Sequence, residues 1–537
     1  MTVKTQHQAA NETQLKNQQK HLQPDIQTTP NLRKQSLPYH GDGKHYFEKI
    51  KGFAYPVYFD SNAASSNGRF DIITAAPRAL LSSASSEKSI SNTIAHNAQT
   101  VITLPDTLLT SVSETISNRA LVNTAEQLLS SYASTPTSIS TSTSTSTAFQ
   151  AASDEFPFVS GLVGLFSYEF GLSRHALTSA QGTAQPNILL GIYQWAIIID
   201  HEKKRSHLVA DNKLPDNHWL DLSAWLEDCS KKIDIPDSKF RLTEHWQSNL
   251  NRKQYNEQFK TAIDYIESGD CYQINLAQRF SSRYQGSPWQ AYQHLRATAP
   301  TPFAFYMETT NTATLSLSPE RFISVDKGHV ITQPIKGTRK RGENPEQDKL
   351  LIEELKSAEK DRAENLMIVD LLRNDLGKHC KHGSIAATEL FKIETHPNVH
   401  HMVSTITGEL AEVSAGASLK LLLDCLPGGS ITGAPKKRAM EIIAELEPND
   451  RSLYCGSCVY IDRGGNMDSN ILIRSLLAQK DPQYSSSKAD VATEQGDIYC
   501  WGGGGIVADS NADAEYAEAL QKIQNLLDKL ADLQREE

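Results

Sequence analysis

Strand-like and helix-like segments follow one another in blocks along this chain, and not in strict alternation. Before about residue 246, short apolar segments rich in aromatic residues are bounded by Asn, Ser and Gly, a pattern typical of strands. Beyond that point, segments with apolar residues near helical spacing lie between further strands. The blocks favour an α+β fold, with antiparallel β-sheets packed together and helices on the outside, over a doubly wound parallel sheet.

The apolar pattern places these elements along the chain. Strands are predicted at 55–59, 70–74, 158–168, 188–199, 272–280, 313–317, 330–334, 454–461, 470–478 and 498–501, with 454–461 and 470–478 forming a pair. Helices are predicted at 253–268, 344–376, 418–423, 436–446 and 514–533.

Changes of composition divide the chain into regions. Residues 1–38 are rich in Gln, Asn, Thr and Lys and are expected to be a disordered tail, because they cannot bury enough apolar surface. A low-complexity Ser/Thr tract at 131–147 is predicted to be an insertion within an N-terminal region at 39–245. Residues 246–537 form the second region, in which 480–496 is expected to be a loop between two strands.

Charge and apolar content exclude several classes of protein. The net charge of −10 leaves no basic surface for nucleic acid. No run of about 18 apolar residues occurs, and the N-terminus has no apolar stretch, so neither a membrane span nor a secretory signal is expected. The seven cysteines suit a reducing cytoplasm. Cys455 and Cys458 are expected to pack in the interior, because no second pair of metal ligands lies near them.

The segment PIKGTRKRG (334–342) places Lys336 at the end of a predicted strand, before a glycine that lets the backbone turn. The cations at 339–341 disfavour protonation of a neighbouring amine, so Lys336 is a candidate nucleophile with a lowered pKa. The alternative is a solvated basic loop. Glu320 and His401 lie beside apolar segments, and each is either an acid or base in catalysis or a structural residue.

Two pairs of acidic residues have helical spacing. Asp361 and Glu364 share a face of one predicted helix, and Glu515 and Glu518 share a face of the last helix. Carboxylates from two helices, with water and substrate oxygens, match the octahedral oxygen shell that Mg²⁺ prefers. Pairs with this spacing are also common on exposed helix surfaces.

Two further segments are candidates for binding an anion. Gly502 to Gly505 follow a predicted strand, and they either expose backbone N–H groups to a ligand or form a plain tight turn. Arg474 is predicted to share a strand face with Leu472 and Leu476. A cation among apolar neighbours needs either a salt bridge or a carboxylate ligand.

The order of these segments resembles that of the chorismate-binding enzymes, a family that includes anthranilate synthase large subunits, isochorismate synthases and salicylate synthases. The resemblance rests on PIKGTRKRG, DRAENLMIVDLLRNDLG, VHHMVSTITG, GGSITGAPKKRAM, DSNILIRSLL and GGGGIVADSNADAEYAEA, within residues 246–530. RFDIITAAP and FVSGLVGLFSYEFG extend it to about residues 39–530. It implies an anthranilate synthase component I-like fold, with a chorismate-binding catalytic region at 246–537.

Position 336 separates the branches of this family. Members that make anthranilate or isochorismate typically have alanine there, whereas members that make 4-amino-4-deoxychorismate have lysine. Gln273 lies where members that use water carry a lysine base, and its amide suits ammonia as the nucleophile. The resemblance implies a Mg²⁺-dependent transferase that aminates chorismate, on the route to para-aminobenzoate and folate. The alternatives are an anthranilate synthase and, from another class, a non-catalytic binding scaffold.

The resemblance also implies a role for each candidate residue. Lys336 attacks chorismate, Glu320 protonates the leaving hydroxyl, and His401 lies near the ring. Glu364 and Glu518 hold Mg²⁺, with Glu515 and Asp361 in support. The residues implied to bind the substrate are Arg474, Tyr454, Gly503, Gly505, Ser430 and Gln273.

None of the cysteines lies in the G-x-C-x-G context of a glutaminase nucleophile. The resemblance therefore implies that ammonia comes from a separate glutamine amidotransferase subunit, in a heterodimer. Feedback-inhibited anthranilate synthases carry Leu-Leu-Glu-Ser near the N-terminus, whereas the comparable segment here is Tyr58 to Ser61. Inhibition by tryptophan is therefore not expected.

Overall fold

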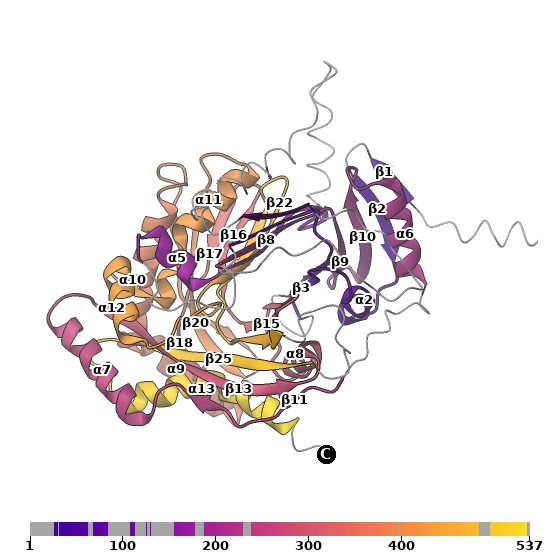
Figure 1. Ribbon diagram of the computed structural model, residues 1–537. Coiled ribbons are helices and arrows are strands. Elements are labelled where there is room, and N and C mark those ends of the chain that lie inside the picture. The colour runs from indigo at the N-terminus through magenta and orange to yellow at the C-terminus, as the bar shows by residue number, and fades with distance from the viewer. Residues whose placement is uncertain are drawn as a thin grey trace, which may run out of the picture.

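The computed structural model describes residues 26–29, 32–62, 68–83, 108–112, 125, 129, 155–177, 187–228, 238–396, 398–482 and 494–533. Two β-sheets run through the molecule, and helices lie around them (Figure 1). The larger sheet has 14 described strands and the smaller has 11. Both take strands from either side of residue 245, so the expected division at that residue separates parts of the sequence and not the sheets.

The strands of the larger sheet follow one another in space in an order that differs from their order in the sequence. Its strands are β1 (Ile26–Thr29), β2 (Leu32–Leu37), β10 (Arg205–Asp211), β9 (Trp195–Asp200), β4 (Phe70–Thr74), β3 (Val57–Asp60), β14 (Phe303–Glu308), β15 (Thr312–Ser318), β24 (Ser475–Lys480), β25 (Gln495–Ile506), β13 (Gln273–Gln285) and β11 (Arg241–Leu242). Two short strands, β12 (Gln247–Ser248) and β21 (Gly433–Ala434), also pair with β13.

The smaller sheet carries the strand with the candidate nucleophile at its edge. Its order is β18 (Ile335–Lys340), β20 (Val399–Glu409), β17 (His329–Thr332), β16 (Arg321–Asp326), β23 (Met467–Asn470), β22 (Ser457–Asp462), β7 (Gly161–Phe166), β8 (Ile188–Tyr193), β5 (Ala79–Ser83) and β6 (Leu108–Val112), with β19 (Ala386–Thr395) also paired to β20. Among the described strands, every pair in both sheets is antiparallel except β5–β6, which is parallel.

The helices cover the outer faces and edges of these sheets (Figure 1). They are α2 (Lys44–Ile50), α5 (Tyr168–Arg174), α6 (Asp216–Glu227), α7 (Arg252–Glu267), α8 (Pro288–Thr298), α9 (Pro345–Ser357), α10 (Glu359–Leu376), α11 (Ala415–Cys425), α12 (Lys436–Leu446) and α13 (Ala512–Asp532), with a 3₁₀ turn, η1 (Gly429–Ile431). Side chains of Asn251, Asn344, Ser414 and Asn511 cap α7, α9, α11 and α13, because each accepts a backbone N–H of the first helical turn. Within the described part of the chain, no helix combines the length and the apolar character needed to cross a membrane.

Alternation along the strands divides the interior into two cores. In β9, Ala196 and Ile198 face a cluster that includes side chains of both sheets. Trp195, Ile197 and Ile199 face a second cluster, which the larger sheet shares with α2, α6, α8 and α13. All of β9 is therefore buried, because both faces of this strand are covered.

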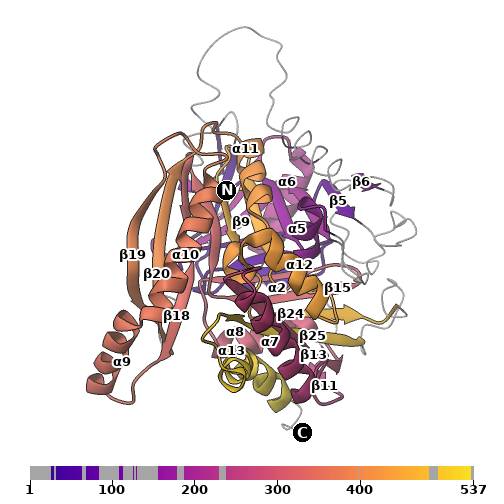
Figure 2. The same ribbon diagram turned by 90° about the vertical axis from the view of Figure 1, so that its left-hand side faces the viewer.

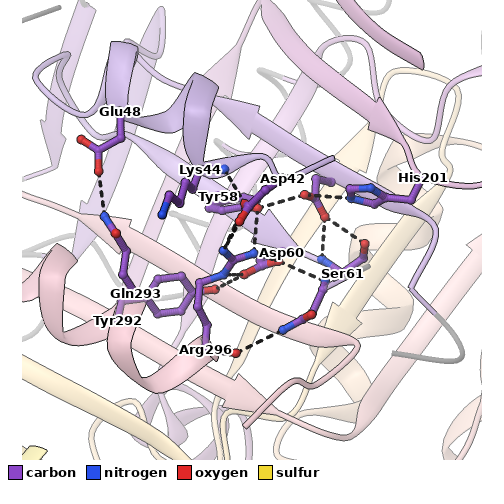
Figure 3. Close-up of polar contacts among 12 residues, drawn as sticks. Asp42, Lys44, Glu48, Tyr58, Asp60, Ser61, His201, Tyr292, Gln293 and Arg296 are labelled. Atoms are coloured by element: carbon purple, nitrogen blue, oxygen red, sulfur yellow. Dashed lines mark hydrogen bonds and ion pairs between the residues drawn. The ribbon is translucent and has the colours of Figure 1, made fainter. Parts of the chain in front are cut away.

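A buried polar network joins the N-terminal strands to α8 (Figure 3). Asp60 accepts hydrogen bonds from Arg296 Nη2, at 3.0 Å, and from the hydroxyl of Tyr292, also at 3.0 Å. Asp71 accepts from both the backbone N–H and the hydroxyl of Ser61, each at 2.9 Å. Each buried charge is thus hydrogen-bonded within the fold, as a structural brace requires.

The expected fold class, α+β with antiparallel sheets and outer helices, is confirmed, but several predicted elements were wrong. The helix predicted at 344–376 is two helices, α9 and α10, because Ala358 takes an extended backbone with ψ 98°. The strand predicted at 188–199 is two strands, β8 and β9, and they belong to different sheets. The segments 454–461 and 470–478 do not pair, since β22 lies in the smaller sheet and β24 in the larger.

The prediction of a disordered tail at 1–38 was wrong for its last third. Residues 26–29 and 32–37 form β1 and β2, and β2 pairs with β10 at the edge of the larger sheet. Residues 1–25 and 30–31, the Ser/Thr tract at 131–147 and residues 483–493 of the predicted loop lie outside the described residues.

Candidate active site

Lys336 and Glu320 both contact Ser430, which lies 94 and 110 residues further along the chain. Lys336, at the start of β18, donates a hydrogen bond from Nζ to the backbone oxygen of Ser430 over 3.1 Å. The Ser430 hydroxyl donates to Oε1 of Glu320 over 3.0 Å. The turn η1 therefore links the amine of Lys336 to the carboxyl group of Glu320 through a single residue.

Burial lowers the pKa of Lys336, and the nearby Lys522 lowers it further, against the attraction of Glu364, Glu320 and Glu518. The predicted cause was wrong. Arg339 and Arg341, the arginines that follow Lys336, are ion-paired to carboxylates on α9 and α10, so their charges are compensated. The prediction that a strand ends at Lys336 was also wrong, because Lys336 is the second residue of β18. A lowered pKa increases the fraction of neutral amine, which is the form that nucleophilic attack requires.

Glu320 follows β15 and is buried, with 6% of its surface exposed. Burial raises the pKa of its carboxyl group to about 7, although Lys336, the Ser430 hydroxyl and the backbone N–H of Ile335 oppose this shift. A carboxyl group with this pKa exchanges a proton near neutral pH, as a general acid must.

Carboxylates of α10 and α13 act on the amine of Lys336, because the charges of Glu364 and Glu518 raise its pKa. Burial raises the pKa of Glu364, and the charges of Asp361 and Glu515 raise it further. Glu518 pairs with Lys522 over 2.9 Å, and Glu515 with Lys360 over 3.5 Å. Figure 2 shows α10 beside β18 and β20, with α13 below them.

These carboxylates suit a hard divalent cation in their chemistry. Within the described ranges, no three acidic, histidine or cysteine side chains already converge as a metal cluster. Glu364 nevertheless makes no hydrogen bond or close ion pair with any other described side chain, although it is partly buried. A partly buried carboxylate without such a partner is stabilised by a bound cation. Asp361 is engaged by Arg339 over 3.2 Å, and Glu515 by Ser510 over 2.6 Å.

Arg474 does not lie in a strand, which corrects the predicted face shared with Leu472 and Leu476. It precedes β24 and has a φ of 50°, in the left-handed region that non-glycine residues rarely adopt. Burial lowers the pKa of its guanidinium, with Glu320 as the opposing charge. Its side chain makes no hydrogen bond or ion pair within the part of the chain that is described. The structure thus supports a guanidinium available to a carboxylate ligand over a structural salt bridge.

The run Gly502 to Gly505 is not a turn, because all four residues lie inside β25 and pair with β13. Glycine is needed for close approach. A Cβ on Gly505 would lie 2.1 Å from Nε2 of Gln273, and one on Gly503 would lie 2.7 Å from the backbone oxygen of Leu276. Tyr454 stacks on the indole of Trp501 in the same strand, with ring centroids 6.3 Å apart.

Two more predicted residues are buried here. Gln273 is 1% exposed, and its Oε1 accepts no hydrogen bond from any described group. His401 lies 2.9 Å, Nδ1 to Oγ1, from Thr338 in the neighbouring strand. Burial, aided by Arg474, lowers the pKa of His401 to about 3. The imidazole is therefore neutral at physiological pH, which suits contact with the substrate better than acid catalysis.

Lys522 was missed by the sequence reasoning. Its Nζ donates to the backbone oxygen of Gly503 over 3.2 Å and pairs with Glu518. Its charge acts on both Lys336 and Glu320. The signal in the sequence was its position four residues after Glu518, but this spacing is also typical of ordinary surface ion pairs.

Comparison with known proteins shows similarity to a family model, to named relatives and to a solved structure. Residues 83–528 match the family model described as chorismate binding enzyme. Aminodeoxychorismate synthase component 1 of Salmonella typhimurium is 38% identical over 500 residues, covering 92% of this chain and 97% of that protein. The protein of the same name from Escherichia coli is 44% identical over 380 residues, covering 70% and 78%. The crystal structure of anthranilate synthase component I from Streptococcus pneumoniae TIGR4 matches with a TM-score of 0.63 at 26% identity, covering 86% of this chain and 92% of that chain.

Proposed function

Since the chain belongs to the family of chorismate binding enzymes, we propose that it aminates chorismate to 4-amino-4-deoxychorismate, as the first component of an aminodeoxychorismate synthase. The single observation that carries this proposal is the placement of Lys336. Its amine, with a pKa lowered by burial, is linked through Ser430 to a carboxyl group with a pKa of about 7. The similarity to proteins of that name supports the same activity.

The reaction is a double displacement. The neutral amine of Lys336 attacks C2 of chorismate, both ring double bonds shift, and the C4–O bond breaks. Glu320 gives its proton to the departing hydroxyl, which leaves as water, and then takes the extra proton of the new C2–N bond. Ammonia attacks C4, both double bonds shift back, and Glu320 protonates the lysine nitrogen as the C2–N bond breaks. Two displacements replace one difficult substitution, which is the usual gain from covalent catalysis.

The carboxylates of chorismate need cationic partners. Arg474 is assigned to the enolpyruvyl carboxylate, because its guanidinium is free of other described partners and has a fork that fits a carboxylate. Tyr454 and the backbone at Gly503 and Gly505 are assigned to the same carboxylate. His401, neutral at physiological pH, lies beside Arg474 and contacts the ring.

Magnesium belongs to the same proposal. Glu364 and Glu518 would hold the ion, and when bound it would neutralise the charge of the ring carboxylate. Asp361 and Glu515 are engaged with Arg339 and Ser510, and their role is to support the ligands. Lys522 orients Glu518 and keeps the pKa of that carboxylate low, although burial opposes this.

The ammonia is supplied by a glutamine amidotransferase subunit in a heterodimer. The names of the relatives, which call them component 1, support a second component. Gln273 lines the site with an amide that cannot act as a base towards water, so the site favours an amine nucleophile over hydroxide. The enzyme is assigned to the cytoplasm, where chorismate amination supplies para-aminobenzoate and folate.

Mass spectrometry after addition of chorismate and Mg²⁺ without ammonia tests the proposal. We expect a mass gain localised to Lys336, which Lys336→Ala abolishes. Lys480→Met is the matched control, because Lys480 is also partly buried but is paired to Glu308 over 2.7 Å, outside the site. The control should keep the adduct. Formation of fluorescent anthranilate from chorismate and ammonium, with no lyase added, would instead assign the chain to the anthranilate branch.

A further inference from the structure

Arg451 is the buried cation that lies behind the site. It follows α12, and 1% of its surface is exposed. Its Nε and Nη2 donate to the two carboxylate oxygens of Glu447, over 2.8 and 2.6 Å. Nη1 also donates to the backbone oxygen of Ile431 over 3.0 Å, and Nη2 to that of Asn275 over 2.7 Å. One guanidinium thus connects α12 to η1 and to β13.

The contact with Ile431 places this cation one residue from Ser430. The backbone N–H of Asn275 donates to the oxygen of Thr432 over 2.8 Å, so the same C-terminal end of the turn is also tied to β13. Glu447 in turn accepts from the backbone N–H of Ala277 over 2.9 Å. The C-terminal end of the turn that carries Ser430 is therefore held by Arg451 and by β13.

The stability of this arrangement does not require an arginine. Burial of an ion pair is expensive, and apolar residues of similar volume often serve the fold equally well. A planar guanidinium, however, fixes two backbone oxygens at defined positions while its other donors hold a carboxylate. The guanidinium therefore sets the position of η1. That position determines how Ser430 meets the amine of Lys336 and the carboxyl group of Glu320.

We propose that Arg451 is a positioning residue, which acts through η1 to hold Ser430 where it orients the amine of Lys336 and the carboxyl group of Glu320. Its effect on turnover rests on the proposed function. Arg451 does not touch the substrate in this arrangement, so it governs the chemical step more than the binding of chorismate.

A double-mutant cycle in kcat tests the coupling. Loss of one hydrogen bond to a charged group predicts that Ser430→Ala lowers kcat about tenfold. Arg451→Gln should lower kcat by at least as much, with KM for chorismate changed by less than about threefold. The kcat of the double variant should be at most about twofold lower than that of Arg451→Gln, since both changes break the same link. Independent effects that multiply in the double variant would overturn the proposal.

The matched control is Arg296→Gln. Arg296 also has a largely buried guanidinium paired to a carboxylate, Asp60, but it lies in the N-terminal network (Figure 3). This variant should lose stability and keep the kcat of the folded enzyme. A fall in kcat of the same size in Arg296→Gln and Arg451→Gln would assign both to general destabilisation.

Two measurements keep the test decisive. If Arg451→Gln does not fold, the same cycle is made with Glu447→Gln, which weakens the pair and keeps its shape, and a wild-type kcat there would sink the idea. The rate at which acetic anhydride labels Lys336 in the free enzyme should rise at least threefold in Arg451→Gln, because the displaced turn uncovers the amine. This rate does not depend on turnover. A wild-type enzyme that fails to aminate chorismate would therefore refute the proposed function alone, and an unchanged labelling rate would refute the role of Arg451.

Discussion

Replacement of Arg474 by glutamine should separate stability from activity. Within the described residues, the guanidinium has no hydrogen bond or ion pair, and burial lowers its pKa, so the folded protein bears the cost of a poorly solvated cation. The unfavourable backbone conformation, with φ at 50°, is the same for both residues and cancels. Glutamine relieves the charge, and the free energy of unfolding should rise by about 1 kcal/mol.

The same change removes the partner proposed for the substrate carboxylate. A guanidinium fork makes two charge-assisted hydrogen bonds, and loss of this contact costs about 3 kcal/mol in binding and transition-state stabilisation. Each 1.36 kcal/mol is a factor of ten, so kcat/KM for chorismate should fall a little more than about a hundredfold. Thermal unfolding and steady-state kinetics with saturating ammonium measure the two effects on one protein sample.

Arg283→Gln serves as the control with the opposite pattern. Arg283 is paired to Asp481 and Asp497, at 2.6 and 3.1 Å, at the far end of β13. Its loss should cost about 1 kcal/mol of stability, as a partly exposed ion pair does, and leave kcat/KM unchanged. A destabilised Arg474→Gln with normal chorismate kinetics would show that Arg474 is a structural brace, and the reasoning would fail.

Three further residues of the site, Glu320, His401 and Glu364, give testable predictions. Glu320 must be protonated to act as an acid, and burial raises its pKa to about 7 from an ordinary value near 4.5, so kcat should fall as pH rises through about 7. The stability that this protonated carboxyl group contributes is complete below pH 4.5 and is lost as pH rises through about 7. The free energies of unfolding of the wild type and Glu320→Gln, measured by urea titration, should therefore diverge in that window. Parallel curves would contradict the assignment. Because the pKa of His401 is about 3, its NMR ring signals should stay constant between pH 5 and 8, and a midpoint near 6.5 would show that the imidazole is not buried as described. Glu364→Gln should weaken Mg²⁺ binding by at least tenfold, since even groups behind the ligands contribute about 10–100-fold. The control is Glu353→Gln, which changes an exposed carboxylate on α9 and should not weaken binding. Equal calorimetric affinities in both variants would remove Glu364 from the metal site.

Local patterns were sufficient for much of the fold. Helix α12 was predicted with the bounds that the structure has, because apolar residues at helical spacing begin after Pro435, a strong punctuation signal. The block order of elements gave the α+β class for the same reason. The family likeness came from ordered motifs that are contiguous in the sequence, so it needed no knowledge of how the segments meet.

The sequence by itself determined the class of fold, the family likeness and which residues are candidates, since periodicity, breakers and motifs are properties of neighbouring residues. Only the tertiary structure decided that β8 and β9 enter different sheets, that the glycine run is a strand packed on Gln273, and that Arg474 has no described partner. It also decided that burial lowers the pKa of Lys336, and that Ser430 joins this amine to Glu320. The physical reason is that desolvation and charge pairing depend on distances between residues that are far apart in the chain.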